Sequence, residues 1–153
     1  MNGYFDDKMK EIMKIHPACG PLKSINYKLH VWTDGVYVYK LCRPGELEIE
    51  TSVEIMSDPY FHGRVPKLIK AYHKENLLVM ELIPGKTMYE IHKGDVDDIE
   101  LMDTVKIMGP EVWEWLQNSK YETAYMDLNG ENIILDDRDG KWKFIDFDGW
   151  MKK

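Results

Sequence analysis

Four stretches of the chain carry apolar residues at the three- and four-residue spacing of an amphipathic helix. The first stretch runs through Phe5, Met9 and Ile12, and its helix must end before Pro17 because proline cannot continue a helix. The second lies within residues 43–60, where apolar and acidic residues recur at helical spacing. Both stretches are predicted to form short helices.

The third and fourth helices follow each other closely. Asp95 suits the N-cap of a helix that continues to Met108. The pattern then breaks, and Pro110 fits the first turn of the fourth helix. Trp113 and Trp115 lie two residues apart in this helix, so they cannot both face the core, and one of them marks a candidate partner surface.

Alternating polar and apolar residues predict antiparallel strands between these helices. Residues 24–40 alternate around "TDG", the signal of a β-hairpin that turns at Asp34 and Gly35. Four further strands carry the same signal. Two lie within residues 65–85, before the third helix, and two lie near the C-terminus, at Asn132–Leu135 and Trp142–Ile145. This order of helices and strands predicts an α+β fold without internal repeats.

Composition narrows the class of protein. Hydrophobic residues make up 44% of the 153 residues and charged residues 31%, which is typical of a globular domain. A net charge of -7 argues against binding to nucleic acid, because such proteins need a basic face. No apolar run approaches the roughly 18 residues that span a bilayer. We therefore expect a cytoplasmic protein with no membrane association.

Three polar residues near the end of the chain point to a chemical function. Asp127 and Asn132 lie five apart on a predicted loop, and Asp146 follows a strand that would pair with the strand leaving Asn132. A hairpin brings such residues to one end of the sheet. A carboxylate and an amide oxygen suit Mg²⁺, and the remaining carboxylate, Asp127, can orient a hydroxyl and accept its proton. This is the chemistry of phosphoryl transfer.

The same residues carry a family resemblance. "MDLNGENIIL" followed by "FIDFDG" resembles the catalytic and metal-binding loops of the protein-kinase-like superfamily, which includes protein kinases, the RIO and Bud32 atypical kinases and the aminoglycoside phosphotransferases. The resemblance implies that Asp127 is the catalytic base. It also implies that Asn132 and Asp146 are the metal ligands and that Mg²⁺ and ATP are the cofactors.

The resemblance implies further roles in the first half of the chain. Lys40 ends the strand "VYVYK", where the family places its phosphate-binding and catalytic lysine. Glu50 is expected to pair with Lys40, although Glu48 and Glu54 compete for this role on the same predicted helix. Ser24 lies in the loop that stands in place of a glycine-rich loop, and it is a candidate phosphate contact.

The resemblance also implies a two-lobe, protein-kinase-like domain with a small antiparallel sheet in its N-lobe and a strongly truncated helical C-lobe. The segment "LLVMELIPG" resembles the strand and hinge that hold adenine, and backbone groups from Glu81 to Ile83 are expected to bind it. The single domain covers 1–153, with an N-lobe at about 1–84, a hinge at about 81–86 and a C-lobe at about 87–153.

The chain departs from the family pattern in several places. Tyr125 replaces the usual His, Asn129 stands where relatives carry Lys or His, and Gly149 comes one position late for the common "DFG". The printed sequence ends four residues after Gly149, so we expect no activation segment and none of the helices that hold peptide substrates. Such a small C-lobe leads us to expect a homodimer or a partner protein that covers its helices.

Two functions follow from these observations. The first is a minimal Mg-ATP-dependent phosphotransferase that transfers the γ-phosphoryl group to a hydroxyl of a protein or a small molecule. The alternative is a pseudokinase-like module that binds nucleotide or protein and regulates a partner, which the changes at Tyr125 and Asn129 favour. The intact set of Lys40, Asp127 and both predicted metal ligands favours the enzyme. The sequence does not identify the acceptor or separate ATP from GTP.

Overall fold

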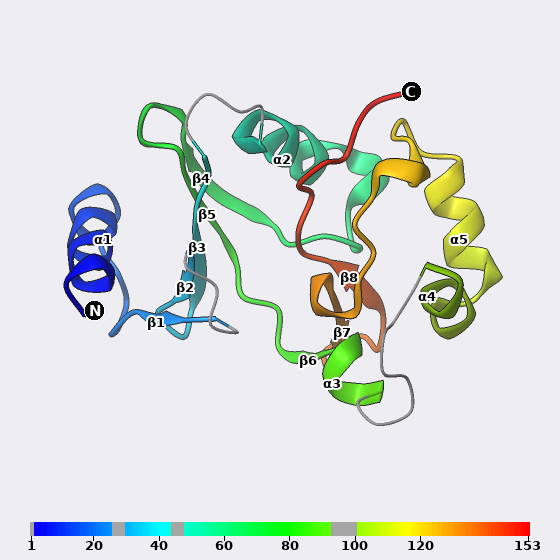
Figure 1. Cartoon of the computed structure of the whole chain (residues 1–153), viewed down its shortest axis with the longest axis horizontal. Coiled ribbons are helices and arrows are strands. Elements are labelled where there is room, and N and C mark those ends of the chain that lie inside the picture. The colour runs from blue at the N-terminus through cyan, green and yellow to red at the C-terminus, as the bar shows by residue number, and fades with distance from the viewer. Residues whose placement is uncertain (1, 26–29, 44–47, 93–100) are drawn as a thin grey trace. The chain divides into compact units, whose positions relative to one another are not determined.

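The computed structural model describes residues 2–25, 30–43, 48–92 and 101–153. The chain divides into two compact units, and Figure 1 shows the elements of both. The first unit comprises Met1–Val53 and Lys67–Leu82, and the second comprises Glu54–Pro66 and Ile83–Lys153. The predicted α+β class with a small antiparallel sheet is confirmed. Among the described residues, no helix has the length and apolar character needed to cross a bilayer.

The first unit is built on a five-stranded antiparallel sheet with the strand order β1–β2–β3–β5–β4. Helix α1 covers one face of this sheet (Figure 1). The elements are α1 (Asn2–Ile15), β1 (Lys23–Ser24), β2 (Val31–Thr33), β3 (Tyr37–Leu41), β4 (Leu68–Tyr72), the 3-10 helix η2 (His73–Glu75) and β5 (Leu77–Glu81). Helix α2 (Glu48–Ser57) begins in this unit and ends in the second.

The predicted hairpin turn is held by Asp34, which joins β2 to β3. Its Oδ1 accepts hydrogen bonds from the N–H groups of Val36 (2.9 Å) and Tyr37 (2.8 Å). Its Oδ2 accepts from the Cys19 N–H (2.8 Å) and the Tyr39 hydroxyl (2.6 Å). Burial acts to raise the pKa of Asp34, but these four hydrogen bonds outweigh it and lower the pKa to about 2. The turn is therefore built around an ionised carboxylate.

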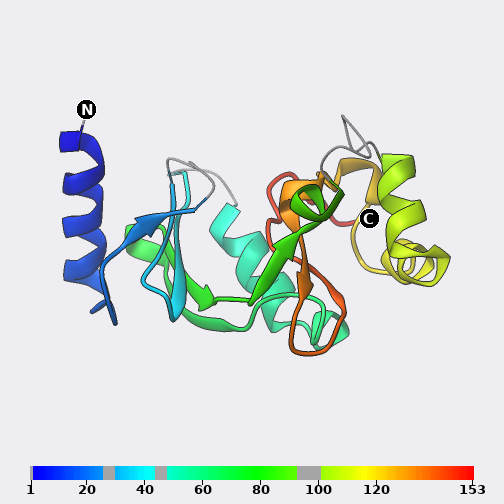
Figure 2. The ribbon, with the colours of Figure 1, turned by 90° about the horizontal axis from the view of Figure 1, so that it is seen from below.

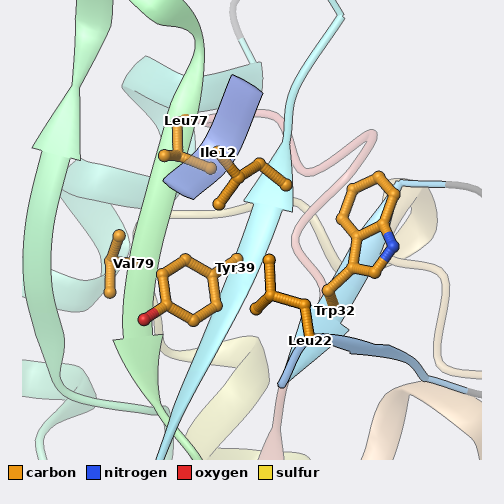
Figure 3. Packing of buried hydrophobic residues seen from close by; sticks show 6 residues of the cluster. All are labelled: Ile12, Leu22, Trp32, Tyr39, Leu77 and Val79. Carbon is orange, nitrogen blue, oxygen red and sulfur yellow. The ribbon is translucent and has the colours of Figure 1, made fainter. Parts of the chain in front are cut away.

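The core of the first unit lies between α1 and the sheet (Figure 3). Ile12 of α1 is fully buried, as its place on the predicted apolar face requires, and it packs with Tyr39 and Val79, which are direct partners across β3 and β5. Because successive side chains of a strand point to opposite faces, Lys40 lies on the face of β3 that turns away from α1. Helix α1 therefore does not cover the face of the sheet that carries Lys40.

The second unit combines a three-stranded antiparallel sheet of order β6–β7–β8 with short helices, and Figure 2 shows it from a second direction. Helices α4 and α5 pack against each other. The elements are η1 (Pro59–Phe61), β6 (Gly85–Thr87), α3 (Met88–His92), α4 (Leu101–Met108), α5 (Pro110–Gln117), η3 (Thr123–Tyr125), η4 (Gly130–Asn132), β7 (Ile133–Asp136) and β8 (Trp142–Phe144).

Within the second unit, the predicted ends of the helices and strands lie close to the observed ones among the described residues. Pro110 occupies the first turn of α5, and the preceding Gly109 adopts a positive φ of 93° that favours glycine. Both predicted C-terminal strands form a hairpin. Asp95, the predicted N-cap of the third helix, lies outside the described residues. Helix α4 is described from Leu101 onward.

Aromatic side chains form much of the core of the second unit. Trp115 stacks on Tyr60 with ring centroids 5.1 Å apart, and it meets Phe61 edge-on. Trp150 contacts both Phe144 and Phe61 from the end of the chain. Rings in these orientations contribute roughly 0.5–1.5 kcal/mol per pair beyond the area they bury. Trp150, which lies three residues before Lys153 and outside the helices and strands, is therefore part of the packed core of this unit.

Candidate functional site

A loop that begins at Met126 carries the first candidate residue, Asp127. Burial alternates along this loop, because Met126 and Leu128 are buried whereas Asp127 and Asn129 are exposed. Two apolar side chains thus anchor the loop to the second unit, and the carboxylate between them is turned toward solvent. An exposed carboxylate on an anchored loop is suited to meet an incoming hydroxyl.

Hydrogen bonds hold this loop in one conformation. The Asn132 amide nitrogen donates to the backbone carbonyl of Asp127 (3.2 Å), which joins the two predicted site residues directly. The Asn129 amide nitrogen lies 3.2 Å from Oδ1 and 3.4 Å from Oδ2 of Asp127. From helix α4, the Thr104 hydroxyl donates to the carbonyl of Leu128 (3.0 Å). Both the backbone and the side chain of Asp127 are thereby restrained.

The β7–β8 hairpin places Asn132 and Asp146 at the same end of the sheet. Ile133 pairs with Phe144, and the Ile145 N–H donates to the Asn132 carbonyl (3.0 Å), so Asp146 follows immediately at the strand end. The Asp148 N–H donates to Asp146 Oδ1 (3.0 Å). Strand pairing therefore places Asn132 and Asp146 at one end of the hairpin, and the hydrogen bond from Asn132 ties the backbone of Asp127 to that end.

The chemistry of these groups fits a magnesium ion. The nitrogen of the Asn132 amide donates to the Asp127 carbonyl, so the amide oxygen is the atom of that side chain with the chemistry of a metal ligand. Asp146 adds a carboxylate. Among the described residues, no group of three or more His, Cys, Asp or Glu side chains is arranged so that it could hold a metal ion by itself. Two protein oxygens suit Mg²⁺, which keeps several waters and takes other ligands from phosphates.

Lys40 has a carboxylate partner in the first unit, but this partner is Glu48. The Lys40 Nζ lies 3.2 Å from Glu48 Oε1, and both side chains are almost fully buried. Glu48 Oε2 accepts a hydrogen bond from the Arg43 N–H (3.0 Å), which fixes the carboxylate at the first residue of α2. The choice of Glu50 is wrong, because two residues turn a helix by roughly 200° and leave that side chain exposed.

The remaining predicted residues occupy different settings. Ser24 is exposed on β1, at one edge of the five-stranded sheet, and pairs with Trp32. Glu81 is half-buried, and its N–H donates to the Lys67 carbonyl (2.9 Å), so this donor is used within the first unit. Ile83 is buried and belongs to the second unit. The Glu81 N–H is therefore removed from the predicted adenine contacts.

Sequence reasoning missed two contacts at this site. It did not single out Thr104, although a threonine three residues after Leu101 and four before Met108 on an apolar helix face indicates a buried hydroxyl with a partner. It also interpreted Asn129 only as the loss of a cationic or histidine side chain. The contact of the Asn129 amide with Asp127 depends on the loop conformation, which sequence spacing does not show.

No protein-family model matches the sequence, and no curated protein matches it. Two solved structures of WbdD are similar to the chain. One, a low-resolution structure with its C-terminal bundle ordered, has 17% identity and a TM-score of 0.56 over 80% of this chain. The other, a co-crystal structure with the kinase inhibitor LY294002, has 15% identity and a TM-score of 0.52 over 80%. At these identities the likeness shows the fold alone, a kinase-like one.

The match covers only part of each WbdD chain. It spans 27% of the first and 31% of the second, so this chain corresponds to less than a third of either protein.

Proposed function

We propose that the protein is a Mg-ATP-dependent phosphotransferase that phosphorylates a hydroxyl group. The observation that supports this most strongly is the joining of Asp127 to Asn132 by a hydrogen bond at the hairpin end that also carries Asp146. A carboxylate that can act as a base and two oxygens of the kind that bind Mg²⁺ are the groups that phosphoryl transfer needs at one place. The kinase-like fold shared with WbdD adds support at the level of fold.

Asp127 has the central role in the proposed reaction. Its carboxylate orients the acceptor hydroxyl and takes its proton while the hydroxyl oxygen bonds to the γ-phosphorus of ATP. The bond from that phosphorus to the β,γ-bridging oxygen breaks, and ADP leaves. Asn132 and Asp146 would hold Mg²⁺, which when bound neutralises phosphate charge. Positioning supplies most of the catalysis in such reactions. We therefore expect the rate to depend mainly on how firmly the loop holds Asp127.

Lys40 would bind the α- and β-phosphates of the nucleotide. Lys40 is only 4% exposed, and its Nζ is paired with Glu48, which holds the side chain in a fixed direction. Ser24 remains a candidate phosphate contact, and backbone groups from Glu81 to Ile83, without the Glu81 N–H, remain candidates for adenine.

Nucleotide binding is tested by thermal unfolding with and without Mg·ATP. A ligand at 100 times its dissociation constant stabilises a protein by about 2.7 kcal/mol, or roughly 5–10 °C for a chain of this size. We expect the wild-type protein to show a rise that requires Mg²⁺ and that Asp146→Ala abolishes.

The matched control is Asp137→Ala. Asp137 is exposed in the β7–β8 turn, at the other end of the hairpin from Asp146, and its substitution removes the same charge. This variant should keep the full rise in midpoint with Mg·ATP. Absence of a rise in the wild-type protein, or an equal loss in both variants, would contradict the assignment of Asp146.

A second candidate function is a pseudokinase-like module that binds a protein partner. The exposed Tyr125 supports it, because 57% of this aromatic residue faces solvent two positions before Asp127. Large exposed aromatic side chains are common in protein interfaces. Tyr125→Ala should leave Mg·ATP binding unchanged in either case. Binding of nucleotide without any transfer would favour this second function.

A further inference from the structure

We infer that Asn129 and Thr104 are positioning residues that hold Asp127 for transfer, Asn129 through the carboxylate and Thr104 through the loop backbone. This inference rests on the proposed function, because it assigns to Asp127 the role of base. Neither residue is implied by the family resemblance, in which position 129 carries a lysine or a histidine.

The Asn129 side chain has only one orientation that satisfies its neighbours. Its oxygen accepts a hydrogen bond from the Glu131 N–H (2.8 Å), so its NH₂ group must be the end that faces Asp127. The amide nitrogen then lies within 3.2 Å and 3.4 Å of the two carboxylate oxygens. One residue thus caps the η4 turn with its oxygen and restrains the carboxylate with its nitrogen.

Thr104 restrains the same loop from the protein interior. Its side chain is fully buried on α4, and its hydroxyl donates to the carbonyl of Leu128, the residue between Asp127 and Asn129. A buried carbonyl that loses its donor is energetically costly, so the loop would shift to recover a partner. Such a shift would move the Asp127 carboxylate along with the backbone.

The two contacts restrain different motions of Asp127. Thr104 fixes where the backbone of the loop lies, whereas Asn129 fixes the rotation of the Asp127 side chain. Because the donor at position 129 is a neutral amide, it restrains the carboxylate without adding a positive charge beside the transferring phosphate. A displacement of about 1 Å at such a site costs on the order of a hundredfold in rate.

Paired variants separate the effect of the hydrogen-bond donor from the effect of side-chain shape at each position. Asn129→Asp keeps the oxygen that accepts from Glu131 but replaces the donor with a carboxylate that repels Asp127. Thr104→Val keeps the shape and removes the hydroxyl, whereas Thr104→Ser keeps the hydroxyl. Asn118→Asp makes the same substitution at the exposed C-terminal end of α5 and serves as the charge control.

The rate readout is ADP formation from Mg·ATP with water as the acceptor, together with the dissociation constant for Mg·ATP. We expect Asn129→Asp and Thr104→Val to lower the rate at saturating nucleotide by about tenfold or more. Their dissociation constants should stay within about twofold, since neither residue is assigned to nucleotide. Thr104→Ser should recover most of the rate and Asn118→Asp should match wild type. Equal rates in wild type and Asn129→Asp would overturn the inference.

A second readout does not depend on catalysis. The side-chain NH₂ protons of Asn129, identified by their loss in Asn129→Asp, are compared by NMR in wild type and Asp127→Ala. A downfield proton that moves upfield in Asp127→Ala supports the contact, and unchanged shifts would overturn the inference whatever the rates. A shift in this signal with no ADP formed by wild type would instead overturn the proposed function, while the contact between the two side chains would stand.

Discussion

The acidic side chains of this protein differ in the ion pairs and hydrogen bonds that they make. Glu48 is held by Lys40 and by a backbone N–H, whereas Glu50 on the next half-turn is exposed. Asp136 is held by Arg138 and Lys143 in the β7–β8 turn. The pairing partner, rather than the residue type, therefore decides which of these acidic groups matters for binding or stability.

The ion pair of Lys40 leads to a prediction about nucleotide affinity. Glu48→Gln removes the carboxylate charge that pairs with the buried Lys40 ammonium group. We expect the affinity for Mg·ATP, measured by calorimetric titration, to fall about tenfold or more. Glu50→Gln, which neutralises an exposed carboxylate on the same helix, should have no effect. A larger loss of Mg·ATP affinity in Glu50→Gln than in Glu48→Gln would instead support Glu50 as the partner of Lys40.

Asp136 makes stability depend on pH in the acid range. Hydrogen bonds from Arg138 are the main cause that lowers the pKa of this buried carboxyl, and the pKa falls from 3.8 to about 2. A lowered pKa stabilises the fold above the unfolded value of 3.8, and this contribution is lost as the pH falls toward 2. It is worth about 2 kcal/mol at neutral pH.

The corresponding variant is Asp136→Asn. Its free energy of unfolding in urea at pH 7 should lie about 2 kcal/mol or more below that of wild type, and the difference should shrink as the pH is lowered from about 4 toward 2. Asp137→Asn, at the exposed neighbouring position, should lie within about 0.5 kcal/mol of wild type at every pH. A difference that does not change with pH would contradict the role of the charge.

At the scale of elements, helix α1 depends on one buried face. Ile12 is fully buried in the core of the first unit, whereas the next residue, Met13, is 52% exposed. Ile12→Ala should lower the free energy of unfolding by about 2–5 kcal/mol because it leaves a cavity, and Met13→Ala should change it by less than about 0.5 kcal/mol. Denaturant unfolding measures both values. Similar values for the two variants would show that α1 does not pack as described.

The pairing of β6 with β7 requires a glycine at one position. Gly85 has φ of 147°, and a Cβ atom there would lie 2.0 Å from the backbone oxygen of Leu135. Because backbone atoms cannot move aside as a side chain can, Gly85→Ala should separate the two strands. We expect a loss of several kcal/mol in the free energy of unfolding, whereas Gly140→Ala, in the exposed β7–β8 turn with open space around it, should cost less.

At the scale of the whole molecule, the sequence predicted the elements better than the contacts. Periodicity located the helices and hairpins because it reflects local burial, and the turn at Asp34 followed from residue type. The choice between Glu48 and Glu50 could not be made, since it depends on where α2 begins. The roles of Thr104 and Asn129 also depend on how a loop folds against a helix, which spacing along the chain does not specify.

We propose that this chain transfers a phosphoryl group with Asp127 as the base. The most direct measurement follows the phosphorus signals of ATP and its products by NMR, with Mg²⁺ present, for wild type and Asp127→Ala. We expect wild type to consume the γ-phosphoryl group. Asp127→Ala should lose this activity by about a hundredfold or more while it keeps its affinity for Mg·ATP. Equal consumption by the two proteins would contradict the claim.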